Sequence, residues 1–153
     1  MLGRVEVVTD VALNGGAAPT TFALGLVTGA QLKFWIEEAE MFVDLVGKVT
    51  YSDTVVERAD FTIFVDGVDI ANAAVLNGLA AHTAAVAGDR NTVSFVRTVR
   101  LAQGAHMAQI RMKAPVGVVT VRGTVVPCEL VAFRNSHMAT LGHGVDSKVQ
   151  LAQ

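Results

Sequence analysis

The stretch that decides the fold is residues 106–113, with the sequence HMAQIRMK. In this stretch Ala108, Ile110 and Met112 alternate with mostly polar neighbours, and this period of two is typical of a β-strand with one buried face. Residues 31–37, QLKFWIE, repeat the alternation. Strands of this kind need partner strands, so the two segments predict an antiparallel β-protein.

Further strand signals lie on both sides of these two segments. Apolar runs separated by turn residues occupy 40–51, 61–65, 92–101, 118–121 and 125–133. Asp66-Gly67 predicts a tight turn that residues 68–70 follow as the hairpin partner. Gly47 predicts a bulge or bend inside its run. Roughly seven or eight strands with little helical period indicate an antiparallel β-sandwich, or jelly roll, over residues 31–134.

The segments outside this domain have a different composition. Residues 4–8 could form a short strand, but residues 14–30 are rich in Gly, Ala and Thr without a clear period, so we expect 1–30 to form an extended N-terminal arm. The polar, glycine-containing residues 135–153 are expected to form a C-terminal arm. The alanine-rich residues 71–88 fit a short helix and a loose loop equally well.

The composition indicates shared apolar surface. The chain has 153 residues, of which 52% are hydrophobic and 17% charged, against about 25% charged in ordinary globular chains. Its mean hydropathy is +0.46, yet no apolar run of about 18 residues predicts a membrane helix. Residues 61–65 are apolar on both faces, with Phe64 opposite the core side. We therefore expect part of the surface to be buried against other copies or other proteins.

Few residues suggest chemistry. Cys128, the one cysteine, lies in an apolar strand and is interpreted as a buried thiol. His106 begins a strand after a glycine turn, which favours a turn or packing role. His137 and His143 have poor spacing for a metal, and a polar contact of the tail is the favoured interpretation. We expect no catalytic, cofactor or metal site and no enzymatic activity.

Acidic and basic clusters also have structural interpretations. Asp66 and Asp69 are read as turn residues, although a weak ion site stays open. The glutamates that follow residue 36 fit a solvated strand end. Basic residues in neighbouring strands favour subunit contacts over nucleic acid, since the formal net charge is −2. They are Arg97, Arg100, Arg111 and Arg122.

The second half of the chain has a familiar pattern. Residues 92–106, TVSFVRTVRLAQGAH, give an apolar strand, a glycine turn and a histidine, and the strand 107–112 follows. The segments 120–123 (TVRG), 128–133 (CELVAF) and, upstream, 64–67 (FVDG) fit the same scheme. Over residues 31–134 the chain thus resembles the tumour-necrosis-factor-like jelly roll of many tailed-phage virion proteins. The resemblance implies a homotrimer that serves as a decoration, fibre or tail component. The chain has no collagen-like or heptad repeat, which favours a compact capsid-bound protein.

We therefore expect a structural protein of the virion, assembled in the host cytoplasm, that decorates and stabilises a capsid. Its expected partners are two further copies of itself and the major capsid protein or other virion proteins, with no role for nucleic acid or a membrane. The expected trimer contacts are Phe34, Trp35, Phe64, Val131 and Phe133. The alternative is a receptor- or glycan-binding module of a phage tail tip. Its aromatic platform would be thin, because Trp35 and Tyr51 are the only Trp and Tyr.

Overall fold

The computed structural model describes residues 1–71 and 78–136. Its ladders are all antiparallel, and the fold is the antiparallel β-sandwich, or jelly roll, that the alternating segments predicted. The elements, in chain order, are β1 (Gly3–Val7), β2 (Asp10–Ala12), the 3-10 helix η1 (Leu13–Gly16), β3 (Leu26–Asp53), β4 (Arg58–Val65), β5 (Val68–Asp69), β6 (Ala80–Thr83), β7 (Asn91–Lys113), β8 (Val119–Arg122) and β9 (Cys128–Arg134). Within the described residues, no helix is long and apolar enough to cross a membrane.

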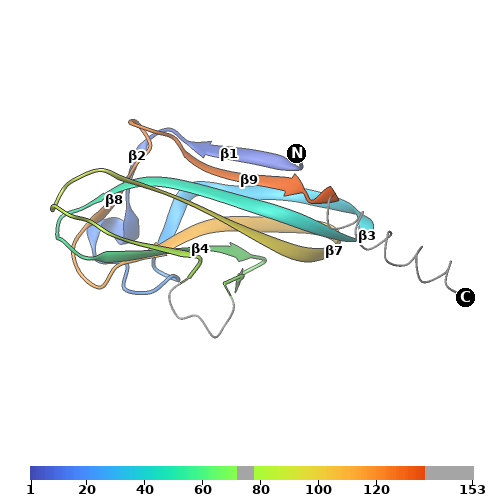
Figure 1. Cartoon of the computed structure of the whole chain (residues 1–153), viewed down its shortest axis with the longest axis horizontal. Helices are drawn as coiled ribbons and strands as arrows, with labels where there is room; N and C mark the ends of the chain where they lie inside the picture. Colours follow the sequence, from blue (N-terminus) through green and yellow to red (C-terminus); the bar gives the residue numbers. More distant parts are fainter. Residues whose placement is uncertain (72–77, 137–153) are drawn as a thin grey trace, which may run out of the picture.

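The two long strands, β3 and β7, form a ribbon that builds both layers of the sandwich. They pair from Leu26↔Arg111 to Tyr51↔Asn91 with two register shifts. At the first, residues 27–30 of β3 lie opposite Ile110, and at the second, residues 37–39 lie opposite Gln103 alone. The ribbon folds back on itself at the second shift (Figure 1). Extra residues of this kind let a strand turn a corner and pass from one sheet to the other.

The remaining strands pair with the two ends of the ribbon or with each other. In the first layer, β9 pairs with β3 residues 43–48, β1 pairs with β9, and β8 and β2 continue from the end of β3. In the second layer, β4 pairs with β7 residues 108–113 and carries β5 and β6. The Phe61 ring of β4 lies 5.2 Å from the Tyr51 ring and 6.1 Å from the Phe95 ring, between centroids, and these contacts join the layers.

Residues 1–30 do not form an extended arm. Strand β1 is hydrogen-bonded along β9, and Leu13 of η1 is 1% exposed in the core. Within residues 71–88, β6 is a strand where a helix or a loop was expected, and residues 72–77 lie outside the described residues. Of the predicted C-terminal arm, Asn135 donates its backbone N–H to the Phe42 carbonyl, while 137–153 lie outside the description.

Two glycines show where local prediction succeeds and fails. The turn at Asp66-Gly67 is confirmed, with positive φ angles of 51° and 84° between β4 and β5. Gly47, by contrast, causes no bulge, because the register of β3 continues through it. A Cβ atom at Gly47 would lie 2.3 Å from the ring of Phe95, so close packing requires glycine there.

Candidate functional site

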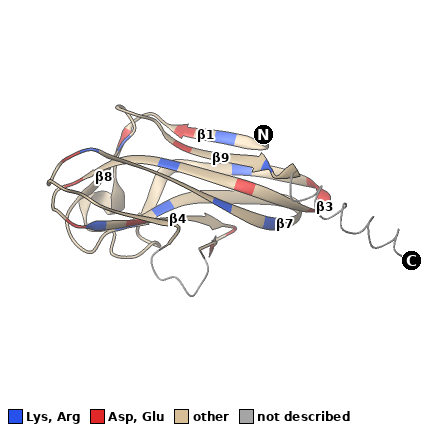
Figure 2. Cartoon of the chain, viewed as in Figure 1, with Lys and Arg blue, Asp and Glu red and all other residues tan. Residues whose placement is uncertain are grey.

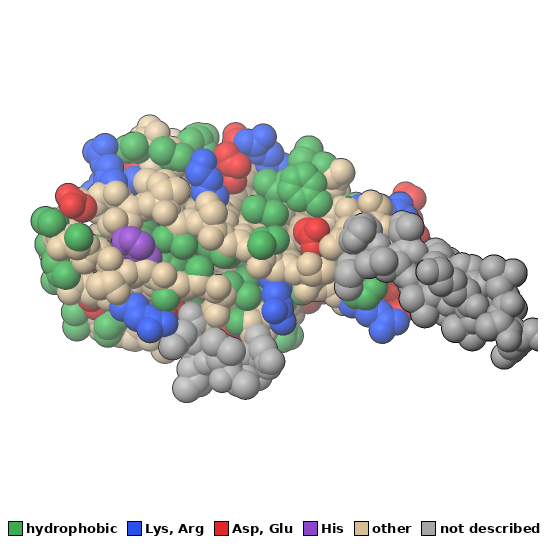
Figure 3. Space-filling view, viewed as in Figure 1, with side chains coloured by type: hydrophobic (Ala, Val, Ile, Leu, Met, Phe, Trp, Pro, Cys, Tyr) green, Lys and Arg blue, Asp and Glu red, His purple; other side chains and the backbone are tan. Residues whose placement is uncertain are grey.

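The outer face of the first layer carries a row of apolar side chains. Val46 on β3 is paired with Val96 on β7 and with Val131 on β9, and directly opposed residues share a face. Phe133 and Phe42 join this face because side chains alternate along a strand. We call these five residues the outer stripe. Figure 3 looks onto this layer and shows hydrophobic side chains gathered between charged ones.

The outer stripe has the character of a contact surface. Val96 is 61% exposed and Phe133 is 41% exposed. Asp44, which accepts a hydrogen bond from Thr98, lies opposite Phe133 on the same face and interrupts the row. Exposed apolar side chains with a polar surround are typical of a surface that binds another protein. The rim holds both signs of charge, including an ion pair between Arg100 and Glu40 and a 3.2 Å pair between Arg4 and Glu129. Such a rim can complement a second copy of itself.

The predicted contact residues divide between the outer stripe and other places. Phe133 is exposed in the outer stripe, whereas Val131, in the same stripe, is only 8% exposed and offers little surface to a partner. Phe34, however, is 7% exposed and belongs to the protein's own core, where its ring lies beside His106. The alternation that exposes Trp35 turns Phe34 inward, so Phe34 offers no surface to a partner.

Phe64 is half-buried, and the chain itself covers part of its ring. The guanidinium carbon of Arg111 lies 4.5 Å above its ring, and the Phe22 ring lies 6.5 Å away. Arg111 also donates from Nη1 to the Phe22 and Ala23 carbonyls and from Nη2 to Gln109, which holds the loop 19–25 over the second layer. The two-sided apolar pattern of β4 is therefore explained in part within one chain.

Sequence reasoning missed three members of the outer stripe, Phe42, Val46 and Val96. The sequence did contain a signal for Val96. It is the one apolar residue among the alternate positions from Ser94 to Arg100, which form the polar face of this strand. A hydrophobic residue on the solvent face of an alternating strand marks a possible contact. Recognising the row, however, required the register that places Val46 between Val96 and Val131.

Trp35 lines a hollow beside the bend of the ribbon. The hollow has a volume of about 270 Å³ and is lined by Met1, Leu2, Trp35, Glu37, Glu38, Met41 and Arg134. Trp35 is 59% exposed, and Arg134 donates to Glu38 over 2.7 Å. An open indole beside carboxylates and a guanidinium can stack on a ligand and hydrogen-bond to it. Tyr51 offers no second platform, because it is fully buried and its hydroxyl contacts Nδ1 of His82.

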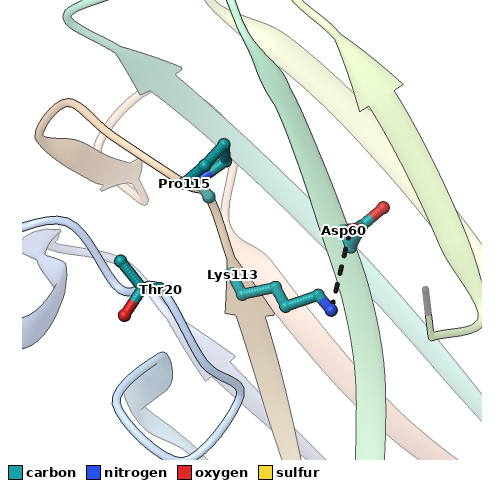
Figure 4. Close-up of a pocket in the computed structure, with 5 residues that line it drawn as sticks. Thr20, Asp60, Lys113 and Pro115 are labelled. Atoms are coloured by element: carbon teal, nitrogen blue, oxygen red, sulfur yellow. Dashed lines mark ion pairs between the residues drawn. The ribbon is translucent and has the colours of Figure 1, made fainter. Parts of the chain in front are cut away.

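A second hollow, of about 210 Å³, lies on the second layer between the loop at Thr20 and the turn at Pro115. Figure 4 shows the Lys113 side chain reaching across it toward Asp60, with Nζ and Oδ2 4.0 Å apart. Arg58 also donates to Asp60, over 2.7 Å. Asp60 and Lys113 are directly opposed on β4 and β7, so this arrangement is a cross-strand charge pair that supports the ladder.

His106 fastens the β4–β5 turn to the bend of β7. Its Nδ1 lies 2.7 Å from Oδ2 of Asp66 and its Nε2 lies 2.8 Å from the Ala102 carbonyl oxygen, so the ring donates to both acceptors when both nitrogens carry protons. Burial alone would lower the pKa of His106, but these two bonds and the Asp66 charge raise it above its ordinary value. Burial would raise the pKa of Asp66, yet the bonds from His106 and the Met107 N–H lower it. This geometry confirms a turn role for His106.

The remaining candidates take separate places. Cys128 is confirmed as a buried thiol, and its burial, together with the Glu129 charge, raises its pKa to about 12. The four arginines do not converge. Arg97 is exposed on β7 opposite Leu45, and Arg100 pairs with Glu40 in the same layer. Arg111 lies on the second layer, and Arg122 binds Asp10 beside β2. Figure 2 shows the two signs of charge interspersed. His137 and His143 lie outside the described residues. Within the described residues, no group of three or more His, Cys, Asp or Glu side chains is placed to hold a metal ion.

Comparison with known proteins gives distant likenesses of fold. No family model matches the sequence, and no curated protein matches it. Among solved structures, the sugar-binding C-terminal domain of EclA is 13% identical, with 87% of this chain and 79% of that chain covered and a TM-score of 0.42. A family 35 carbohydrate binding module from Clostridium thermocellum is 14% identical (84% and 97% covered, TM-score 0.40). A structure of infectious bursal disease virus is 14% identical (88% and 37% covered, TM-score 0.42). At these scores the likenesses carry no inference about function.

Proposed function

We propose that this protein is a non-enzymatic structural protein of a virus particle, which assembles into homotrimers through its outer stripe and decorates the capsid. The observation that supports this proposal is that Val96 and Phe133 are exposed on one layer, with the half-buried Val46 on the strand between theirs. Membership of the tumour-necrosis-factor-like jelly-roll family and binding to the major capsid protein are parts of the same proposal.

The expected mechanism is burial of apolar area. Each Å² removed from water contributes about 25 cal/mol, and a standard interface buries about 800 Å² per partner. The outer stripe alone is smaller than such an interface, so its charged rim and neighbouring strands must join the contact. Many copies bridging neighbouring capsid subunits would then add avidity to a weak single contact.

The first test measures oligomeric mass by light scattering. We expect the wild-type chain to have three times the mass of one copy, and Val96→Glu to lower it by placing a charge in the buried contact. Val68→Glu is the matched control, because Val68 is 67% exposed on β5 in the other layer. Co-sedimentation with undecorated capsids tests whether the trimer binds the capsid. A monomeric wild type, or equal effects of the two substitutions, would contradict the proposal.

A second candidate, glycan binding, is favoured by one observation, the exposed Trp35 in the hollow with Glu37 and Glu38. Saccharides stack their apolar face on such a ring while carboxylates accept their hydroxyl protons. Because Trp35 is the only tryptophan, its fluorescence reports directly on this site. Saturable quenching by a saccharide that Trp35→Ala abolishes would support glycan binding, and a flat titration across a glycan panel would exclude it.

A further inference from the structure

Strand β1 forms one border of the first layer. It pairs with β9 along one edge over all five of its residues, and in the part of the chain that the structure describes no strand pairs with its other edge (Figure 1). Along an antiparallel strand, successive residues direct their backbone N–H and C=O groups alternately to the two edges. The open edge of β1 therefore presents backbone donors and acceptors that can bond to a further strand.

Strand β1 lacks two devices that protect many strand edges from pairing, a proline and a bulge. Its sequence contains no proline, and its register against β9 continues without a shift. Its inward residues are apolar, because Val5 packs half-buried against the core and Val7 is 5% exposed. Arg4 and Glu6 are exposed on the outer face, and Figure 2 shows both signs of charge on this strand. Charges of opposite sign select a partner for the edge.

The acidic charge of this border is only partly balanced within one chain. Glu6 lies directly opposite Glu129 on β9, and like charges in this position destabilise a ladder. Among the described side chains, Arg4 is the one basic group that forms an ion pair with either acid, and it pairs with both. A second guanidinium on the side of Glu6 away from β9 would therefore balance the remaining carboxylate.

A second copy of β1 carries that guanidinium at the required spacing. In an antiparallel ladder directly opposed pairs alternate between two kinds, so a twofold axis must pass between one residue and its own copy. An axis at Arg4 sets two arginines opposite each other, and an axis at Glu6 does the same with two glutamates. An axis at Val5 instead sets Arg4 of each copy opposite Glu6 of the other, and it pairs all five residues of β1.

We propose that β1 pairs antiparallel with β1 of a second copy, centred on Val5, and joins the first layers of two chains into one continuous sheet. In this register Glu6 lies between Glu129 on its own β9 and Arg4 of the second copy. A five-residue edge is much smaller than a standard interface of about 800 Å² per partner, so this contact is weak on its own. It lies at the border of the layer and does not depend on the outer stripe. If the outer stripe forms trimers, paired β1 edges would link one trimer to the next.

Disulfide trapping of the full-length chain tests the register. In a Cys128→Ala background, Val5→Cys places the only thiol at the centre of the proposed pair. Directly opposed Cα atoms lie about 4.5–5.5 Å apart there, a separation that a disulfide spans. Val56→Cys in the same background is the matched control for random collisions, because Val56 is 57% exposed in the loop between β3 and β4. Under mild oxidation we expect the covalent dimer to form at least about tenfold faster at position 5, since the paired edges raise the effective thiol concentration.

Charge exchange in the Val5→Cys protein tests the choice of partner. Arg4→Glu alone opposes glutamates across the axis and Glu6→Arg alone opposes arginines, so each variant should form the dimer as slowly as the control. An equal mixture of the two variants should restore fast trapping, because every glutamate then faces an arginine, and this recovery also shows that neither variant has lost β1. Val96→Glu, which disrupts the outer stripe, should leave the trapping rate unchanged, so failure of the trimer is distinguishable from failure of this contact. Trapping at position 5 no faster than at position 56, or a mixture that traps no faster than its components, would overturn the proposal.

Discussion

Replacing Gly47 by alanine tests how closely the two layers pack. The added Cβ would lie 2.3 Å from Cε2, 2.6 Å from Cζ and 3.0 Å from Cδ2 of Phe95. Phe95 is 6% exposed and rests on Phe61, so its ring has no free space to enter. Overpacking of this kind destabilises the fold by about 1–3 kcal/mol. Alanine loses less backbone entropy on folding than glycine, which offsets about 0.5–1 kcal/mol of that cost. We therefore expect a net loss of about 1–2 kcal/mol in the free energy of unfolding.

Urea denaturation at one fixed protein concentration measures this loss, and a double mutant tests its cause. Phe95→Leu removes the ring edge that the new methyl group meets, at a cost of its own of about 1–2 kcal/mol. If the clash is the cause, Gly47→Ala costs less in the Phe95→Leu background, with a coupling energy of about 0.5–2 kcal/mol. A Gly47→Ala variant as stable as the wild type, or strictly additive costs, would refute the reasoning.

The remaining predictions concern three other contacts. Because folding raises the pKa of His106, its contribution to stability is complete below pH 6.5, the ordinary pKa, and is lost as the pH rises through the raised value. The advantage of the wild type over His106→Asn in urea denaturation, about 1–2 kcal/mol at low pH, should therefore shrink with rising pH, and an advantage that grows would contradict the assignment. Arg111→Met removes the bonds that hold the loop at Phe22, so limited proteolysis should cut this loop faster than in the wild type, whereas unchanged cleavage would mean that the loop is held otherwise. Gly67→Ala forces an L-residue to a φ of 84° and should cost about 1 kcal/mol, measured by the shift in Tm, and no shift would contradict the strain.

Local patterns in the sequence were sufficient for the strands that carry a clean alternation. Ala108, Ile110 and Met112 are each fully buried, as the period of residues 106–113 predicts. The turn at Asp66-Gly67 could also be predicted, because its positive φ angles favour exactly these two residue types. These features depend on neighbours in the sequence.

Features that depend on distant partners could not be predicted. Residues 4–8 could be recognised as a possible short strand, but nothing near them in the sequence shows that β9, more than a hundred residues away, pairs with this strand and ties it to the sandwich. The partial cover that Arg111 and the loop at Phe22 give to Phe64 likewise depends on the fold.

The outer stripe is the central claim, and thiol protection at Val96 tests it most directly. The native thiol, Cys128, is fully buried, so Val96→Cys creates a single accessible thiol, and Val68→Cys provides the control in the second layer. The rate of maleimide labelling is then measured at several protein concentrations. If copies meet through the outer stripe, the cysteine at position 96 becomes protected as the concentration rises, while the one at position 68 reacts at a constant rate. Equal labelling of both cysteines at every concentration would contradict the claim.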